Sequence, residues 1–197
     1  MVMRWTRTIV VLRLGHRYVR DKRLSTHLFL AARAFGAEKA VYTGVREKNV
    51  EETIEEVVKR WGGSFRVEYA EDWVTVVRRW QGEGGTVIHL TMYGLPVLDV
   101  LEKIRRSEKL LVVVGGAKVP REMFDAADWN VAVTSQPHSE VSALSVFLHE
   151  LFDGRELSIN HSNAKLAIVP QVKGKKVVRR DMTQEVNRPG VHRQQER

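Results

Sequence analysis

Between residues 110 and 152 the sequence passes twice through the same series: a short apolar run, a turn and a helix. The first run, 110–114, is rich in valine, too short for a helix and followed by two glycines, as is typical of a buried strand with a tight exit. Pro120 at the first helical position, with Glu122 in the first turn, predicts a short helix that ends near Ala127. Strands that alternate with helices in this way indicate an α/β architecture with parallel strands.

The second run, 131–133, leads into the polar turn 134–138, and Ser139 is expected to cap a helix that ends before Gly154. The apolar residues of this helix fall on one face: Val141, Leu144, Leu148, Leu151 and Phe152. Both turns follow the carboxyl ends of expected parallel strands, where open α/β sheets bind ligands. Their polar groups suit the base, the ribose and the amino-acid tail of a nucleoside-like ligand. Each turn taken alone is equally explained by ordinary turn and cap chemistry.

The chain before residue 110 continues the alternation. Strands are predicted at 8–12, 40–43, 65–69 and 86–90, with amphipathic helices between them, and residues 91–94 form a third turn at a strand end. The first helix is expected to begin at Ser25 or Thr26, after a basic loop at 17–23. Two explanations fit this loop: it binds phosphate groups, or it is a solvated surface loop. The pattern predicts a three-layer α/β domain with a mainly parallel sheet over residues 1–154.

Beyond Gly154 the pattern changes. Short β-like runs at 164–169 and 175–179 surround Pro170 and Gly174, so residues 155–180 are expected to form a hairpin or an extended arm. Residues 181–197 are mostly polar and show no period, which predicts a disordered tail.

The net charge of +8 is spread unevenly along the 197 residues. Residues 1–23 carry seven lysines and arginines against one aspartate, residues 173–197 carry eight against three acidic residues, and the segment between them is mildly acidic. Basic ends of this kind are typical of a nucleic-acid footprint, and equally of tails that keep a protein soluble.

The amino-acid composition excludes several classes of protein and site. The sequence has no cysteine, which excludes disulfides, thiolate metal sites and a cysteine nucleophile and suits a reducing cytoplasm. No segment approaches the roughly 18 apolar residues of a membrane helix, and the amino-terminal residues do not resemble a signal peptide. A cytoplasmic protein without a membrane partner is expected.

Three segments of the chain resemble known motifs: VVVGGAKVP at 112–120, NVAVTSQPHSEVSALSVFL at 130–148 and LRLGHRYVRDKRLSTHLFLAARAFGA at 12–37. The first two resemble the C-terminal signature motifs of the SPOUT methyltransferases. More narrowly, all three resemble motifs of the archaeal tRNA cytidine-56 2'-O-methyltransferases. The resemblance extends at least from Leu12 to Leu151.

This resemblance implies a fold, a cofactor and an activity. SPOUT proteins are homodimers that tie their C-terminal motifs, here about 86–154, into a deep trefoil knot that holds S-adenosylmethionine. The implied reaction is methylation of the ribose 2'-hydroxyl of cytidine 56 in the T-loop of tRNA, with no metal and no DNA partner. Carried over residue by residue, the resemblance assigns cofactor contacts to Leu90, Gly115, Gly116, Ala117, Lys118, Val119, Val133, Thr134, Ser135, Gln136, Pro137, His138, Ser139 and Glu140.

The catalytic and RNA-binding residues follow from the same resemblance. Relatives that methylate ribose often carry an arginine within the first helix, and here Leu30 occupies that place. Arg20, Arg23 or Arg33 would have to take the role, and Arg20 and Arg23 are the assigned candidates. An arginine is a poor base, so its expected role is to align a phosphate and stabilise a developing oxyanion, with His27 or His138 as a proton relay. The expected tRNA contacts are Arg17, Arg20, Lys22, Arg23, Lys173, Lys175 and Lys176.

Other classes fit less well. A dinucleotide-dependent oxidoreductase requires G-x-G-x-x-G in the first βα unit, and a P-loop enzyme requires Ser or Thr after Lys118, and the sequence has neither. The histidines form no H-x-x-x-H pair. The remaining alternative is a non-catalytic RNA-binding module on the same fold, because the charge pattern does not separate it from an enzyme.

Overall fold

The computed structural model describes residues 7–116 and 118–180, except for the side chains of residues 19, 20 and 22. The predicted disordered tail, 181–197, therefore lies outside the described residues. The elements follow in the order β1 (Thr8–His16), α1 (Tyr18–Ala34), β2 (Lys39–Gly44), α2 (Lys48–Trp61), β3 (Arg66–Tyr69), α3 (Trp73–Gly82), β4 (Thr86–Pro96), α4 (Val97–Ile104), β5 (Lys109–Gly115), α5 (Arg121–Ala126), β6 (Trp129–Ala132), α6 (Glu140–Phe152), the 3₁₀ helix η1 (Arg155–Ser158), β7 (Leu166–Val169) and β8 (Lys176–Arg179).

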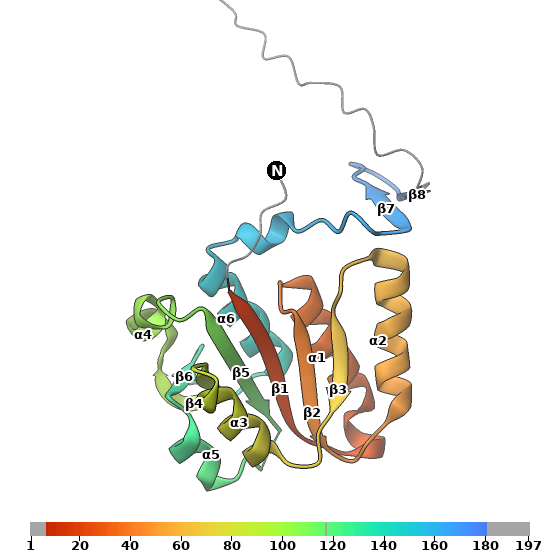
Figure 1. Ribbon diagram of the computed structural model, residues 1–197. Coiled ribbons are helices and arrows are strands. Elements are labelled where there is room, and N and C mark those ends of the chain that lie inside the picture. The colour runs from red at the N-terminus through yellow and green to blue at the C-terminus, as the bar shows by residue number, and fades with distance from the viewer. Residues whose placement is uncertain (1–6, 117, 181–197) are drawn as a thin grey trace, which may run out of the picture.

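The predicted three-layer α/β fold is confirmed. Six strands form one sheet in the order β3-β2-β1-β5-β4-β6, and every neighbouring pair is parallel. Alternate residues of β1 point to opposite faces, as the pleat requires. Ile9 and Val11 pack with α1, α2, α4 and α6 on one face, whereas Val10 and Leu12 pack with α3 and α5 on the other (Figure 1).

The start of α1 differs from the prediction. The basic segment 17–23 forms the helical entry and first turns instead of a loop, and Ser25 lies inside the helix. The N-cap residue, Arg17, makes no side-chain cap hydrogen bond; instead its own backbone N–H donates to Oδ2 of Asp21 at 3.1 Å, which fastens the start of the helix without a Ser or Thr cap. The basic segment is therefore helical from Tyr18 onward.

β4 extends past the strand predicted at 86–90. Leu90 and Leu95 both lie opposite Val131 of β6, so the four residues between them bulge out of the pairing. Gly94 approaches β6 so closely that a Cβ on it would lie 2.4 Å from the carbonyl carbon of Asn130. The turn predicted at 91–94 is this bulge, held against β6 by glycine.

β7 and β8 pair with each other in antiparallel orientation and stand apart from the main sheet above α2 (Figure 1). The link to α2 is made by the Asn163 side chain, which accepts a hydrogen bond from the Gly63 N–H at 2.7 Å, and by the Lys165 N–H, which donates to the Arg60 carbonyl at 3.0 Å. Among the described helices, none combines the length and the apolar character needed to cross a membrane. The trefoil knot stays a prediction from resemblance.

Candidate functional site

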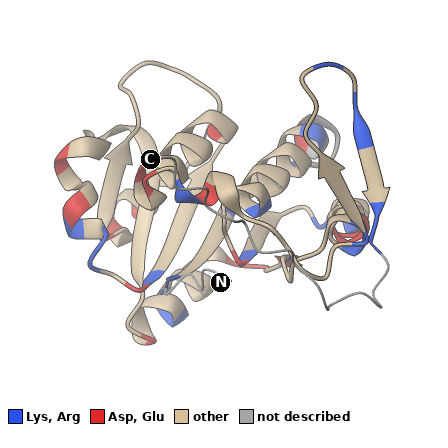
Figure 2. Cartoon of the chain, turned by 90° about the horizontal axis from the view of Figure 1, so that it is seen from above, with Lys and Arg blue, Asp and Glu red and all other residues tan. Residues whose placement is uncertain are grey.

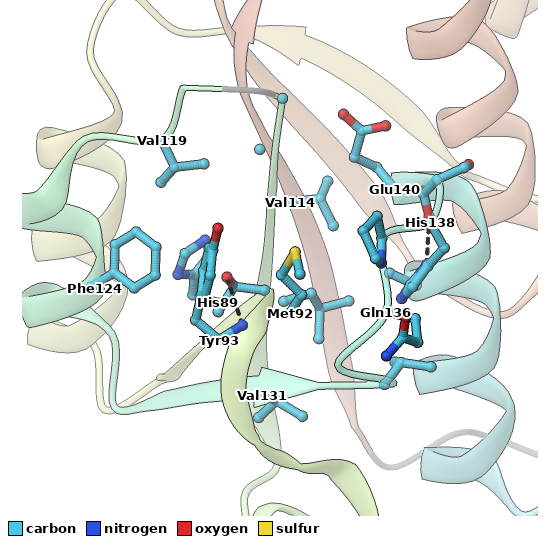
Figure 3. Close-up of a pocket in the computed structure, with 18 of the residues that line it drawn as sticks. His89, Met92, Tyr93, Val114, Val119, Phe124, Val131, Gln136, His138 and Glu140 are labelled. Atoms are coloured by element: carbon cyan, nitrogen blue, oxygen red, sulfur yellow. Dashed lines mark hydrogen bonds between the residues drawn. The ribbon is translucent and has the colours of Figure 1, made fainter.

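A cavity of about 490 Å³ opens at the carboxyl ends of β4, β5 and β6, beside the amino terminus of α6 (Figure 3). Three segments meet there: the bulge of β4, the glycine turn after β5 and the polar turn before α6. This is the edge of the sheet at which the sequence predicts a ligand. The volume lies within the range of small-molecule sites, roughly 300–1,000 Å³.

The cavity gathers most of the residues assigned to the cofactor. Those lining it are Leu90, Gly115, Gly116, Lys118, Val119, Val133, Gln136, Pro137, His138, Ser139 and Glu140. Ala117 lies outside the described residues. Thr134 and Ser135 do not line the cavity; the Thr134 hydroxyl accepts a hydrogen bond from the Gln136 N–H at 3.2 Å and so stabilises the turn itself.

Sequence reasoning missed part of the lining, namely His89, Thr91, Met92, Tyr93, Val114, Phe124, Val131 and Ala143. The position of Thr91, Met92 and Tyr93 at a strand end is a usable signal, because the neighbouring strand ends are the ones assigned to a ligand. Phe124 of α5 carries no such signal, since only the packing of α5 beneath β4 brings it to the cavity. In Figure 3, His89, Tyr93 and Phe124 gather at one side of the cavity, and Gln136, His138 and Glu140 lie at the other.

His89 leaves an unused acceptor at the aromatic side. Its Nδ1 lies 2.8 Å from Oδ1 of Asn130, and the Asn130 amide nitrogen donates to the Phe124 carbonyl at 2.8 Å. The Asn130 oxygen must therefore accept from Nδ1–H, which makes Nε2 the unprotonated nitrogen. Burial lowers the pKa of His89, and the hydrogen bond to Asn130 offsets this only in part. Nε2 is buried and has no partner among the described residues, so His89 brings an unpartnered, neutral acceptor to the lining of the cavity.

Two glycines shape the polar side. A Cβ on Gly115 would lie 2.1 Å from a methyl group of Val119, so any side chain there would force the Val119 side chain to move from the end of β5. A Cβ on Gly116 would lie 3.8 Å from Nη2 of Arg17 and 3.8 Å from Oε1 of Glu140. Gly116 therefore lies close to both the Arg17 guanidinium and the Glu140 carboxylate.

Arg17 is held by a buried aspartate. Asp21, which is 3% exposed, accepts hydrogen bonds from Nε and Nη2 of Arg17 at 3.0 and 3.2 Å. Burial by itself raises the pKa of Asp21, but the hydrogen bonds from Arg17 and the charges of Arg13 and Arg17 outweigh it, so the net pKa is lowered. The carboxylate is thus the ionised anchor of the α1 amino terminus.

Arg13 lies beneath this pair in β1. Its side chain is fully buried, with Nη2 3.6 Å from Oδ2 of Asp21, and none of its guanidinium nitrogens has a hydrogen-bond partner among the described residues. Burial lowers the pKa of Arg13, while the charges of Glu140 and Asp21 raise it. Two arginines and two carboxylates therefore meet where α1 and α6 begin.

The other arginine candidates lie differently. Arg33 donates to the Gly62 carbonyl at 2.7 Å and fastens α1 to the end of α2, so it does not reach the cavity. Leu30 packs against the core. Arg23 and His27 have exposed side chains on α1, and the side chains of Arg20 and Lys22 lie outside the described residues.

A Ser–His–Glu contact beneath α1 resembles a hydrolytic triad. His16 Nδ1 lies 2.7 Å from the Ser25 hydroxyl, and its Nε2 lies 3.1 Å from a Glu47 oxygen. All three side chains are buried, so no substrate reaches the serine. The contact instead ties α1 to β1 and to the segment before α2. Within the described residues, no group of three or more His, Cys, Asp or Glu side chains is arranged to bind a metal ion.

A second basic surface lies on the β7–β8 hairpin. Lys173, Lys175 and Lys176 are exposed there, and residues 165–180 contain no Asp or Glu. Figure 2 shows the Lys and Arg positions running along the hairpin. The hairpin and the start of α1 are the two regions to which the sequence assigns RNA contacts.

A family comparison and similar known proteins point to the same family. The chain matches the family described as tRNA ribose 2'-O-methyltransferase, aTrm56, over residues 61–178. It is 52% identical over 170 residues to a tRNA (cytidine(56)-2'-O)-methyltransferase of Methanopyrus kandleri, covering 86% of this chain and 96% of the relative. It is 51% identical over 174 residues to the protein of the same name from Thermococcus kodakarensis, again covering 86% and 96%.

A solved structure shares the fold. The SpoU methyltransferase AviRb from Streptomyces viridochromogenes, in complex with the cofactor AdoMet, has a TM-score of 0.56 and 15% sequence identity to this chain. The match covers 78% of this chain and 59% of that one. At such low identity the likeness establishes the fold alone.

Proposed function

Because the chain belongs to the aTrm56 family of tRNA ribose 2'-O-methyltransferases, we propose that it methylates the 2'-oxygen of cytidine 56 in the T-loop of tRNA, with S-adenosylmethionine as methyl donor. The observation that carries the proposal is the identity of about half the residues to relatives of that name, over nearly their whole length. S-adenosylmethionine supplies an electrophilic methyl group on a sulfonium sulfur.

The cavity fits this cofactor chemically. The neutral, unpartnered Nε2 of His89 would accept from an N–H or O–H group of the ligand, and the glycine turn exposes backbone polar groups to it. Met92, Val114 and Val131 would pack against apolar ligand surface. The related fold of AviRb is described with AdoMet bound, which supports the same use here.

The direct test is to incubate unmodified tRNA with S-adenosylmethionine that carries a labelled methyl group and to map alkali-resistant linkages. Label at the ribose of cytidine 56 is expected. Label on a base, or on another ribose, would contradict the substrate while leaving the cofactor site intact. Binding of tRNA without any transfer would favour a non-catalytic RNA-binding module.

We assign tRNA binding to the start of α1, with Arg17, Arg20, Lys22 and Arg23, and to the β7–β8 hairpin, because both are basic and exposed where their side chains are described. Replacing Lys173, Lys175 and Lys176 with Gln should weaken tRNA binding. It should also reduce the slope of log affinity against log salt by about 0.7–0.9 for each phosphate that the variant no longer neutralises. Three exposed lysines elsewhere, Lys48, Lys103 and Lys109, serve as a charge-matched control. An unchanged salt slope in the hairpin variant would remove the hairpin from the RNA site.

We also propose a cytoplasmic homodimer that pairs through α1 and α6. Tyr18 of α1 is 60% exposed and Val146 of α6 is 42% exposed, so both helices present apolar surface to solvent. Pairing there would place the start of α1 of one subunit near the cavity of the other.

A further inference from the structure

The two charged side chains that flank Gly116 are not paired with each other. Nη2 of Arg17 and Oε1 of Glu140 each lie 3.8 Å from the position of a Cβ on Gly116, so they are at most twice that distance apart. Among the described residues, they form no ion pair with one another, and Glu140 forms no hydrogen bond through its carboxylate. Glu140 and Gly116 both line the cavity. Two opposite charges that are not paired with each other therefore lie near each other at the edge of the cavity, and we call the space between them the gap between Arg17 and Glu140.

Arg17 is held beside Gly116 by its contact with Asp21. Asp21 binds Nε and Nη2, so the plane of the guanidinium is fixed, and Nη1 has no partner within the described part of the chain. The Asp21 carboxylate is itself fixed from below by Arg13. A buried charge without hydrogen bonds is costly to maintain, which indicates that Arg13 serves the site more than the stability of the fold.

Glu140 is better placed than His138 to accept a proton from a substrate. His138 Nδ1 lies 3.1 Å from the Ser139 carbonyl, and its ring lies beside Gln136 in Figure 3, whereas Glu140 points toward the turn after β5. Glu140 is the only carboxylate among the residues that line the described cavity. Its charge, like that of Asp21, favours the protonated form of both Arg13 and Arg17.

We propose that the reacting ribose enters the gap between Arg17 and Glu140, where Glu140 is the general base and Arg17 binds the adjoining phosphate. The proposal rests on the methyltransferase function. The 2'-oxygen attacks the sulfonium methyl carbon and forms a carbon–oxygen bond. The carbon–sulfur electron pair stays on sulfur, which becomes a neutral thioether, and the 2'-hydroxyl proton passes to the Glu140 carboxylate. Arg17 remains protonated throughout and stabilises the negative charge on the reacting ribose and its phosphate. Arg13 and Asp21 are positioning residues for Arg17.

The first experiment compares Glu140→Gln with Glu122→Gln. Both residues lie in the first turn of a helix, but Glu122 is exposed on α5 and does not line the cavity. We expect the single-turnover methyl-transfer rate of Glu140→Gln to fall by about 10²–10⁴, the usual contribution of a general base. The affinities for S-adenosylhomocysteine and tRNA, measured by calorimetry, should stay unchanged, and Glu122→Gln should behave as wild type.

The second experiment compares Arg17→Lys with Arg46→Lys. The Arg17 side chain is 46% exposed and pairs with Asp21, and the Arg46 side chain is 53% exposed and pairs with Glu51. Lysine keeps the charge but not the two-point contact with Asp21, so only Arg17→Lys should lower the transfer rate.

Three outcomes would overturn the inference: a wild-type rate in Glu140→Gln, a loss of rate matched by an equal loss of S-adenosylhomocysteine affinity, or a wild-type rate in Arg17→Lys. The wild-type reaction is measured in parallel. A wild type that transfers no methyl group would overturn the proposed function itself and this inference with it.

Discussion

At the scale of single residues, Arg13 and Asp21 form a buried pair whose two members should respond differently to substitution. In Arg13→Met, Asp21 keeps Arg17, and an apolar side chain of similar length replaces a desolvated charge. We expect stability to be unchanged or higher, and methyl transfer to be slower. Asp21→Asn should lose about 3–5 kcal/mol, because it leaves Arg13 as an uncompensated buried charge. Urea denaturation and single-turnover assays of both variants test this, and a large stability loss in Arg13→Met would show that Arg13 is structural.

At the scale of elements, the bulge of β4 depends on Gly94. A Cβ there would meet the backbone of Asn130 and Val131 at 2.4 Å, so Gly94→Ala must push β6 away from the bulge. We expect a loss of about 1–3 kcal/mol in stability, as for overpacked sites, together with weaker S-adenosylhomocysteine binding, because Val131 lines the cavity. Gly82→Ala is the matched control, since a Cβ at Gly82 has no atom within 4 Å and the residue lies in α3. If both variants bind S-adenosylhomocysteine equally well, the shape of the bulge does not affect the cofactor site.

A second element-scale contact joins α6 to η1. His149 Nδ1 lies 2.7 Å from Oε1 of Glu156, and this hydrogen bond, with the Glu156 charge, raises the pKa of His149. A raised folded-state pKa means that the pair contributes its full stability below the unfolded value of about 6.5, and that this contribution is lost as the pH rises through the folded value. The difference in thermal midpoint between wild type and His149→Gln should therefore be largest in mild acid and shrink in alkali. A difference that grows with pH would exclude the ion pair.

At the scale of the whole molecule, the proposed dimer would bring the start of α1 of one chain near the cavity of the other. Light scattering at micromolar concentration should give twice the mass of one 22.6 kDa chain. Val146→Glu should shift this mass toward the monomer, because it places a charge on the exposed face of α6. The control, Val172→Glu, changes a fully exposed valine on the hairpin and should leave the dimer intact. A monomeric wild type would contradict the pairing.

The sequence determined the features that depend on near neighbours in the chain. Alternation of strands and helices, the glycine turn after β5 and the Ser139 cap, whose hydroxyl accepts from the Val141 N–H at 3.1 Å, are all set within a few residues. These local signals identified the sheet and the two turns that border the cavity. The resemblance of the motifs in the two turns and the first helix identified the family and, carried over, most of the cavity lining. They failed at α1, which begins at Tyr18 without a Ser or Thr cap and is fastened by the hydrogen bond from the Arg17 N–H to Asp21.

Only the tertiary structure decided which distant residues meet. The strand order places β1 next to β5 and β4 next to β6. This brings Arg13 and Arg17 within reach of the Glu140 charge and leaves His89 against Asn130. Sequence patterns record whether a residue is apolar or polar and how it repeats, but not which other element covers it. A buried arginine in a strand of valines and leucines has no local explanation, because its partners come from helices that begin at the same edge of the sheet.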